Sequence, residues 1–171
     1  MSRDTRTDTG HPMTTPTVLI DDPDFQIVDV RGQHTGAISM IERTSGVMCY
    51  KVEYRPSPID LGRQATQIEV WRDSASAFVS GITQTIFDEL LLPRFCTITN
   101  SSSQTGDVGR LWLSQMAYAA YRGRRVGFGD VTRREIDWCP PDADVRLWLR
   151  SCFEWRHDQD RRGKRYVISL D

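Results

Sequence analysis

The chain has 171 residues, of which 39% are hydrophobic, and its formal net charge is -1. This length and composition suit a folded globule with a sizeable core rather than a disordered chain. The small net charge argues against bulk electrostatic binding to nucleic acid or to an acidic membrane, and no apolar run approaches the roughly 18 residues of a membrane-spanning helix.

The two ends of the chain and its cysteines bear on domain organisation and compartment. Residues 1–16 are polar and lack the apolar segment of a signal peptide, so we expect a disordered N-terminal tail there and one domain over residues 17–171. The four cysteines are far apart, without a Cys-x-x-Cys pair, and the three histidines do not cluster with them. Free thiols in a reducing cytoplasm, and no metal site, are the expectation.

The first half of the chain has the signals of strands. Short segments rich in β-branched and aromatic residues, separated by turn residues, predict strands over 25–30, 36–42, 47–54 and 65–73.

The second half alternates between helices and strands. Apolar residues recur every four positions from Phe78 to Leu90, which predicts a helix that Pro93 ends. A strand over 94–99 follows, then a helix with Gly123 just past its end, a strand over 124–131, a helix over 140–155 capped by Asp142 or Asp144, and a strand over 164–171. This order predicts an α/β (α+β) domain with a single mixed β-sheet and helices on its faces, in which the strands that hold Glu69 and Thr97 are parallel neighbours.

A polar turn over residues 100–107 follows the strand that contains Thr97. Thr105 or Asp107 can cap the next helix, and Ser and Asn are ordinary turn formers. A cap needs only one or two polar groups, however, and ligands of open α/β sheets collect beyond the carboxyl ends of the strands. Ligand contacts from Asn100, Ser103, Gln104 and Thr105 are therefore a second interpretation of the same turn.

The order of elements resembles the GNAT superfamily, the acyl-CoA-dependent N-acyltransferases, over residues 25–128. In that family a run of antiparallel strands ends in one that leads through a glycine-containing turn into a helix, and the turn holds the cofactor pyrophosphate. The matching segment here is QIEVWRDSASAFVSGITQTIF. The resemblance implies that Ser80, Gly81, Ile82 and Thr83 bind acetyl-CoA or another acyl-CoA. The turn has one glycine where the family has two or three.

The resemblance also implies two catalytic residues. Glu69 lies on the strand that often carries a general base in this family, and the alternative is a solvent-facing strand residue. Tyr121 is the candidate acid that protonates the leaving thiolate, and the alternative is an aromatic residue at the edge of the core.

A run of arginines offers a further candidate site. Arg122, Arg124, Arg125, Arg133 and Arg134 are the residues that could hold CoA phosphates or a nucleic acid. Acidic residues follow them, so an internally paired, solvated surface is the favoured interpretation.

Two functions remain after these observations. The first is a divergent N-acyltransferase that acts on an unknown amine. The second is a non-catalytic interaction or inhibitor protein on a GNAT-like scaffold, which binds a protein or nucleic-acid partner.

Overall fold

A computed structural model describes residues 15–32, 35–57, 61–73, 75–76, 81–101, 106–152 and 163–171, without the side chains of residues 106–108. A disordered tail was expected over residues 1–16, and residues 1–14 of it lie outside the described residues.

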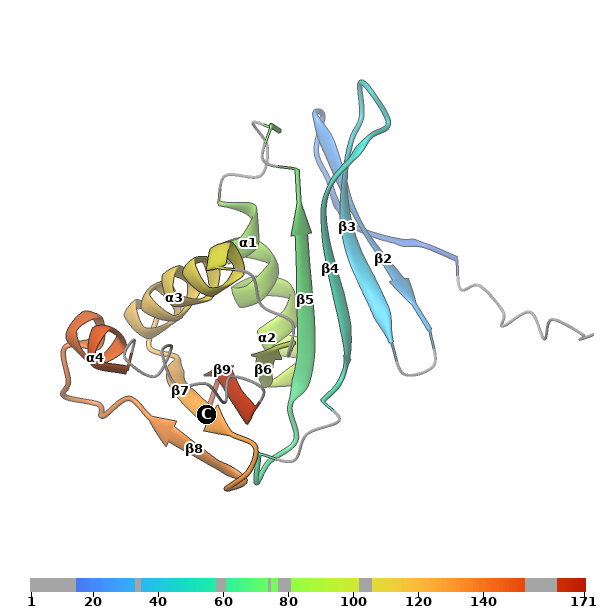
Figure 1. Ribbon diagram of the computed structural model, residues 1–171. Helices are drawn as coiled ribbons and strands as arrows, with labels where there is room; N and C mark the ends of the chain where they lie inside the picture. The colour runs from blue at the N-terminus through green and yellow to red at the C-terminus, as the bar shows by residue number, and fades with distance from the viewer. Residues whose placement is uncertain are drawn as a thin grey trace, which may run out of the picture.

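The described strands form one nine-stranded sheet in the order β1-β2-β3-β4-β5-β6-β9-β7-β8 (Figure 1). Their bounds are β1 Thr17–Asp21, β2 Phe25–Arg31, β3 Gly36–Glu42, β4 Met48–Pro56, β5 Thr66–Arg72, β6 Thr97–Asn100, β7 Arg125–Asp130, β8 Glu135–Trp138 and β9 Lys164–Ser169. Neighbouring strands are antiparallel except β5 and β6, which are parallel. The prediction of one mixed sheet is confirmed, as is the parallel pairing of the strands that hold Glu69 and Thr97.

Two strands of this sheet went unpredicted. β1 is a short edge strand that pairs only with β2, and β8 forms a hairpin with β7. Both are short, and only one of their two edges is paired with a described strand. Pairing with that one neighbour holds them extended.

The helices cover one face of the sheet (Figure 1). A continuous helical segment comprises α1 (Ile82–Thr85), η2 (Ile86–Leu91) and α2 (Leu92–Phe95), and α3 spans Gly106–Tyr121. Both contribute to the same hydrophobic core as β2–β7 and β9. In its centre, the buried ring of Trp112 lies parallel to Tyr166, with 6.1 Å between ring centroids, and meets Phe87 at 5.3 Å. Burial of such large rings is a main stabilising contribution of the core.

Pro93 does not end the first helical segment, contrary to the prediction. The π-helical turn η2 precedes it, and the N–H of Leu92 donates to the carbonyl of Phe87, five residues back. Proline has no N–H to place in such a ladder, and the wider turn accommodates it, so the helix continues to Phe95. Cys96, with a φ of 61°, ends the helix instead. The strand expected from Arg94 therefore begins only at Thr97.

The ends of the other helices agree with the sequence signals. Gly123, with a φ of 77°, follows α3, and the N–H of Arg124 donates to Ala119 over 2.9 Å, as in a glycine C-cap. Asp144 caps α4 (Val145–Ser151) by accepting from the N–H groups of Arg146 and Leu147. Asp144 rather than Asp142 is thus the cap.

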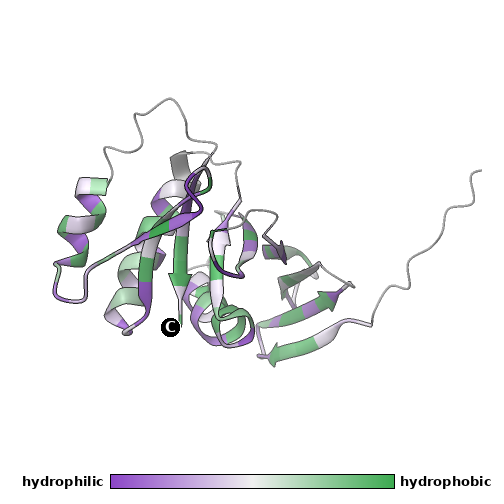
Figure 2. Ribbon diagram, turned by 90° about the horizontal axis from the view of Figure 1, so that it is seen from below, coloured by the Kyte–Doolittle hydropathy of each residue, from purple (hydrophilic) through white to green (hydrophobic). Residues whose placement is uncertain are grey.

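The second face of the sheet is covered over only part of its width. Leu61, in the connection from β4 to β5, lies against Gly129 of β7, where an added Cβ would stand 2.9 Å from the leucine. Arg63 of the same connection forms a bidentate ion pair with Asp171 at 2.9 Å. This connection lies over β7 and the end of the chain. Over β2–β5 polar and apolar residues alternate (Figure 2). By this alternation, the exposed residues Glu53, Arg55 and Glu69 lie on the helix-free face.

Candidate functional site

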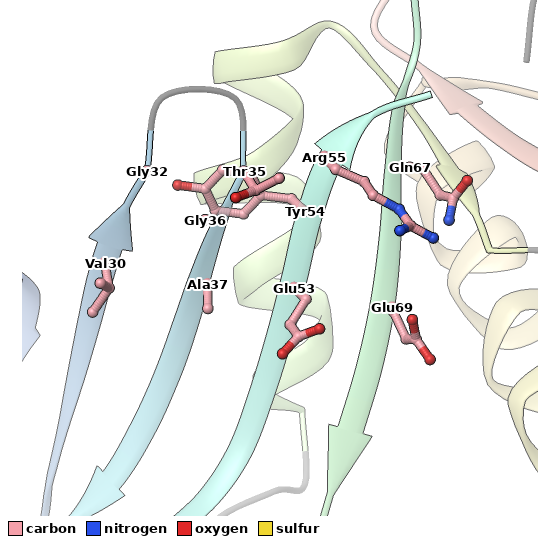
Figure 3. A pocket seen from close by; sticks show the side chains of 10 residues that line it. All are labelled: Val30, Gly32, Thr35, Gly36, Ala37, Glu53, Tyr54, Arg55, Gln67 and Glu69. Atoms are coloured by element: carbon pink, nitrogen blue, oxygen red, sulfur yellow. The ribbon is translucent and has the colours of Figure 1, made fainter. Parts of the chain in front are cut away.

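A cavity of about 430 Å³ lies on the helix-free face of β2–β5 (Figure 3). This volume lies within the range of small-molecule sites. Its lining consists of Val30, Gly32, Thr35, Gly36, Ala37, Glu53, Tyr54, Arg55, Gln67 and Glu69. We call it the β2–β5 pocket.

Strand register sets the charges of this pocket in rows. Val30, Ala37, Glu53 and Glu69 are successive cross-strand partners and form one row. Arg55 and Gln67, which are partners of each other, belong to the next row. Side chains two positions apart on a strand share a face, so both rows point into the pocket.

Two carboxylates stand directly opposite each other in the first row. Glu53 of β4 pairs in register with Glu69 of β5, an arrangement of like charges that destabilises a sheet. Lys51 forms an ion pair with Glu53. Within the described part of the chain, Glu69 has no ion pair. The carboxylate of Glu69 is therefore available to a cationic group of a ligand.

Arg55 supplies the opposite charge in the second row. Gln67 is only 3% exposed, and its amide oxygen, when turned toward Arg55, accepts hydrogen bonds from Nε at 3.2 Å and from Nη2 at 2.8 Å. The amide is neutral, so this contact positions the guanidinium without neutralising it. No described carboxylate forms an ion pair with Arg55.

A buried polar network lies behind this pocket, on the helix-covered face of the same strands. Tyr54 donates to Asp29 Oδ1 at 2.7 Å, and Arg94 Nη1 donates to Asp29 Oδ2 and to the Tyr54 oxygen, both at 3.0 Å. Arg31 Nε donates to the same carboxylate at 2.6 Å. Burial, followed by the hydrogen bond to Asp29, raises the pKa of Tyr54. The network joins β2 and β4 to α2, which contains Arg94.

β5 and β6 separate next to this pocket. Their pairing covers Thr66–Ile68 of β5, and the N–H of Ser101 adds a last bond to the Ile68 carbonyl at 3.2 Å. Beyond this point no described residue pairs with β5 on its β6 side. Glu69 is the first residue past the last pair. The unpaired edge of a strand is a ready template for an extended ligand.

Gly81 precedes the first helical segment in a left-handed conformation, with a φ of 77°. No described atom lies within 4 Å of the position of a Cβ there. No side chain of the described residues caps this helix, so none of them accepts from its first N–H groups. A helix N-terminus of this kind favours an anion.

The other residues predicted for the cofactor turn differ in their positions. Ile82 and Thr83 are 8% and 5% exposed, so their side chains belong to the core, and only their backbone N–H groups can face a ligand. Ser80 lies outside the described residues.

Asn100 is used within the fold. It is 1% exposed, its side-chain oxygen accepts from the N–H of Tyr166 at 2.6 Å, and its amide nitrogen donates to the Ser101 carbonyl. Its side chain therefore extends the pairing between β6 and β9. Ser103, Gln104 and Thr105 lie outside the described residues, so the interpretation of the polar turn as a site stays a prediction.

Tyr121 is not brought together with Glu69. It is the last residue of α3, on the helix-covered face, and its side chain is 88% exposed. Glu69 lies on the opposite face. The structure thus separates the pair that the resemblance placed in one catalytic centre.

The arginine run is largely engaged with neighbouring side chains. Arg124 donates to the buried Asp88 at 3.0 Å, and Arg122 lies 3.4 Å from the same carboxylate. Arg125 stacks on Trp138, with 4.2 Å from its guanidinium carbon to the ring centroid. Arg133 lies 3.9 Å from Asp130, and Arg134 also has an interaction partner. The internally paired surface is the better description of this run.

Sequence reasoning missed Glu53, Arg55 and Gln67 as site residues. The signal was the alternation in KVEYR and TQIEVW, where Lys51, Glu53 and Arg55 share one face of β4 and Gln67 and Glu69 share one face of β5. What the sequence lacked was the register that places these faces side by side.

Other classes of site find no support among the residues that the structure describes. No group of three His, Cys, Asp or Glu side chains there could hold a metal ion, and no helix there is long and apolar enough to cross a bilayer. Comparison of the chain with protein-family models, with curated proteins and with solved structures gives no significant match.

Proposed function

We propose that the protein is a divergent acyl-CoA-dependent N-acyltransferase of GNAT type, and that the β2–β5 pocket holds the amine acceptor. The observation that carries this proposal is the position of Glu69. Its carboxylate faces the pocket, and it is the first residue of β5 past the last pair with β6. An acceptor in the pocket would reach this residue, and so would a cofactor bound where β5 and β6 separate.

The cofactor part of the proposal rests on two neighbouring features. The left-handed Gly81 and the following helix, which no described side chain caps, suit a pyrophosphate, because backbone N–H groups and the helix dipole favour an anion. The unpaired edge of β5 past Ile68 offers backbone groups to the amide-containing arm of CoA. α1 also contacts α3, whose beginning lies near it in Figure 1.

The acceptor part rests on charge. An amine arrives mostly protonated at neutral pH, and the carboxylates of Glu53 and Glu69 attract an ammonium group. Glu69, directly or through water, takes one proton and leaves the nitrogen lone pair free. The amine then attacks the thioester carbonyl, the C–N bond forms, and the C–S bond breaks.

The leaving group needs no tyrosine in this scheme. A thiol is a moderately acidic group, so CoA can depart as the thiolate, and the second proton of the nitrogen passes to it through solvent. Tyr121 therefore has no role in the proposal. The scheme places the protein in the cytoplasm, where acyl-CoA is available.

A direct test measures the release of the CoA thiol from acetyl-CoA in the presence of a panel of primary amines. Wild-type protein is expected to show amine-dependent release, and Glu69→Gln at least about a hundredfold less, in line with the usual contribution of a general base. Glu135→Gln, an exposed strand carboxylate on β8, serves as the control and should match the wild type. Equal rates for wild type and Glu69→Gln would reject the role of Glu69.

The non-catalytic interaction protein remains the second candidate because three large apolar side chains are exposed at the ends of β4 and β5. Val47 is 55% exposed, Met48 37% and Trp71 49%. An exposed apolar group of this kind suits a protein partner. This candidate requires no affinity for CoA, which separates it from the enzyme.

A further inference from the structure

We propose that the acceptor is a free amino acid, in which a primary amine and a carboxylate are one or two carbons apart and the side chain is aliphatic. This inference deepens the proposed function and rests on it for the reaction, but the binding of the amino acid itself does not require CoA.

The first argument is the pairing of opposite, uncompensated charges. Glu69 and Arg55 both line the β2–β5 pocket, and within the described residues neither has an ion-pair partner. A simple amine would satisfy Glu69 and leave Arg55 with only the neutral Gln67. A ligand with both charges satisfies both residues, and the guanidinium suits a carboxylate because of its forked donors.

The second argument is spacing. Arg55 and Gln67 are register partners, and Glu69 is two residues along β5 from Gln67. The backbones of the two rows are therefore about 7 Å apart, from a rise of roughly 3.4 Å per residue. The charged groups of Arg55 and Glu69 thus face the same small part of the pocket. A compact ligand that has both charges suits this arrangement.

The third argument is that the side chain of Arg55 is fixed in position before a ligand binds. Gln67 is almost fully buried, and its amide oxygen, when turned toward Arg55, accepts two hydrogen bonds from the guanidinium. Figure 3 shows Arg55 extended toward Gln67 at one end of the pocket and the two glutamates beside it. An arginine fixed in this way loses less conformational entropy when it binds an anion.

The remaining wall defines the side chain of the ligand. Val30 and Ala37 continue the row of Glu53 and Glu69 across β2 and β3, and both are only partly buried. With the amine at the glutamates and the carboxylate at Arg55, the third substituent of the amino acid faces this apolar part. An aliphatic side chain is expected there because it would bury Val30 and Ala37.

Three matched ligands test the inference. Each is titrated into the protein in the absence of CoA, and NMR measures its binding. Leucine has both charges, leucinamide has the amine without the carboxylate, and 4-methylpentanoate has the carboxylate without the amine. Leucine should bind at least about tenfold more tightly than either. Leucinamide also represents a peptide N-terminus, so equal affinity for leucine and leucinamide would overturn the choice of a free amino acid.

Two variants test which residue binds which charged group of the ligand. Arg55→Gln should bind leucine and leucinamide equally, whereas Glu69→Gln should bind leucine and 4-methylpentanoate equally. Arg146→Gln, which removes an exposed arginine on α4, is the matched control and should retain the full preference. A leucine preference unchanged in both pocket variants would overturn the assignment, and melting temperatures no lower than that of the wild type show that both variants are folded.

The same titrations separate this inference from the proposed function. Acyl transfer to leucine and leucinamide at equal efficiency would reject the amino-acid specificity and keep the transferase. Leucine binding through Arg55 and Glu69 without any affinity for acyl-CoA would keep the amino-acid site and reject the transferase.

Discussion

The hydroxyl of Tyr54 on β4 donates a 2.7 Å hydrogen bond to the buried carboxylate of Asp29 on β2, across the intervening strand β3. Gly36 of β3 pairs in register with Tyr54, and a Cβ on this glycine would lie 2.2 Å from the ring carbon Cζ and from the hydroxyl oxygen. The glycine therefore leaves the space in which the ring lies. Arg94, bonded to both partners, ties this part of the sheet to α2.

Gly36→Ala should lower the free energy of unfolding by about 1–3 kcal/mol. The added Cβ displaces the Tyr54 ring, and the buried Asp29 then loses a hydrogen-bond donor. Urea denaturation measures the change. Gly163→Ala is the control, because its nearest described atom lies at an ordinary 3.4 Å. A loss below about 0.5 kcal/mol for Gly36→Ala, the level of an ordinary surface substitution, would show that the ring has room to move.

The raised pKa of Tyr54 predicts a loss of stability in alkaline solution. Burial is the largest cause of the raised pKa, and the hydrogen bond to Asp29 is the next. The folded state holds the neutral phenol more tightly than the unfolded chain does, so this stabilisation is present below about pH 10, the ordinary tyrosine pKa, and is lost as the pH rises through the folded value.

The free energy of unfolding should therefore fall above about pH 10, and less steeply in Tyr54→Phe than in the wild type. Burial also raises the pKa of Tyr50, so the double variant Tyr50→Phe/Tyr54→Phe should fall least. Denaturation at a series of pH values measures this order. The prediction is wrong if the slope of the wild type is retained in Tyr54→Phe.

The fold was predictable where local pattern and tertiary environment agree. Alternation in β2–β5, the cap of α4 and the glycine after α3 each reflect a local preference that the packing reinforces. The connection around Pro93 was predicted wrongly, because proline usually ends a helix and no local pattern predicts the π-helical turn that accommodates it. β8 was missed since it is extended only through its pairing with β7.

The candidate site was predictable only in part. Glu69 could be placed on a polar face of its strand from alternation alone. Its relation to Glu53 and Arg55 depends on register between β4 and β5, which no local pattern gives. Tyr121 illustrates the converse: its place on α3 was predicted, but only the packing of that helix reveals that it lies on the other face of the sheet.

Glu69→Gln should raise the free energy of unfolding, by roughly 0.2–1 kcal/mol, while it removes the contribution of the amine to ligand binding. The substitution removes the repulsion between directly opposed carboxylates on β4 and β5. Thermal or urea denaturation measures this change, and low salt should enlarge it. Glu135→Gln is again the control. A destabilised Glu69→Gln protein would mean that this carboxylate has a structural partner.

Asp88→Asn should destabilise the protein by about 1.5–3 kcal/mol, the usual range for hydrogen bonds to charged groups. Asp88 is buried and accepts from Arg124, while Arg122 lies close by. Arg124→Gln should cost more than Arg122→Gln, because the side chain of Arg122 is 51% exposed and that of Arg124 only 29%. If the two arginine variants had equal stability in urea, the ion pair between Arg124 and Asp88 would contribute no more to stability than an exposed surface contact.

Gly81 provides the most direct probe of the cofactor site. Alanine is an unsuitable substitution, because the φ of 77° would cost it roughly 1–2 kcal/mol. Asparagine tolerates this conformation better, and no described atom lies within 4 Å of the new Cβ. Gly81→Asn should therefore remain folded, with a melting temperature close to that of the wild type, while its side chain obstructs a pyrophosphate at the helix N-terminus.

Calorimetric titration of acetyl-CoA into the wild type and into Gly81→Asn tests the central claim, that the protein binds acyl-CoA at this turn. We expect a saturable heat of binding for the wild type and an affinity at least about tenfold lower for Gly81→Asn, a difference of about 1.4 kcal/mol. Wild-type protein that gives no saturable heat with acetyl-CoA or CoA at millimolar concentration would contradict the acyltransferase and favour an interaction protein.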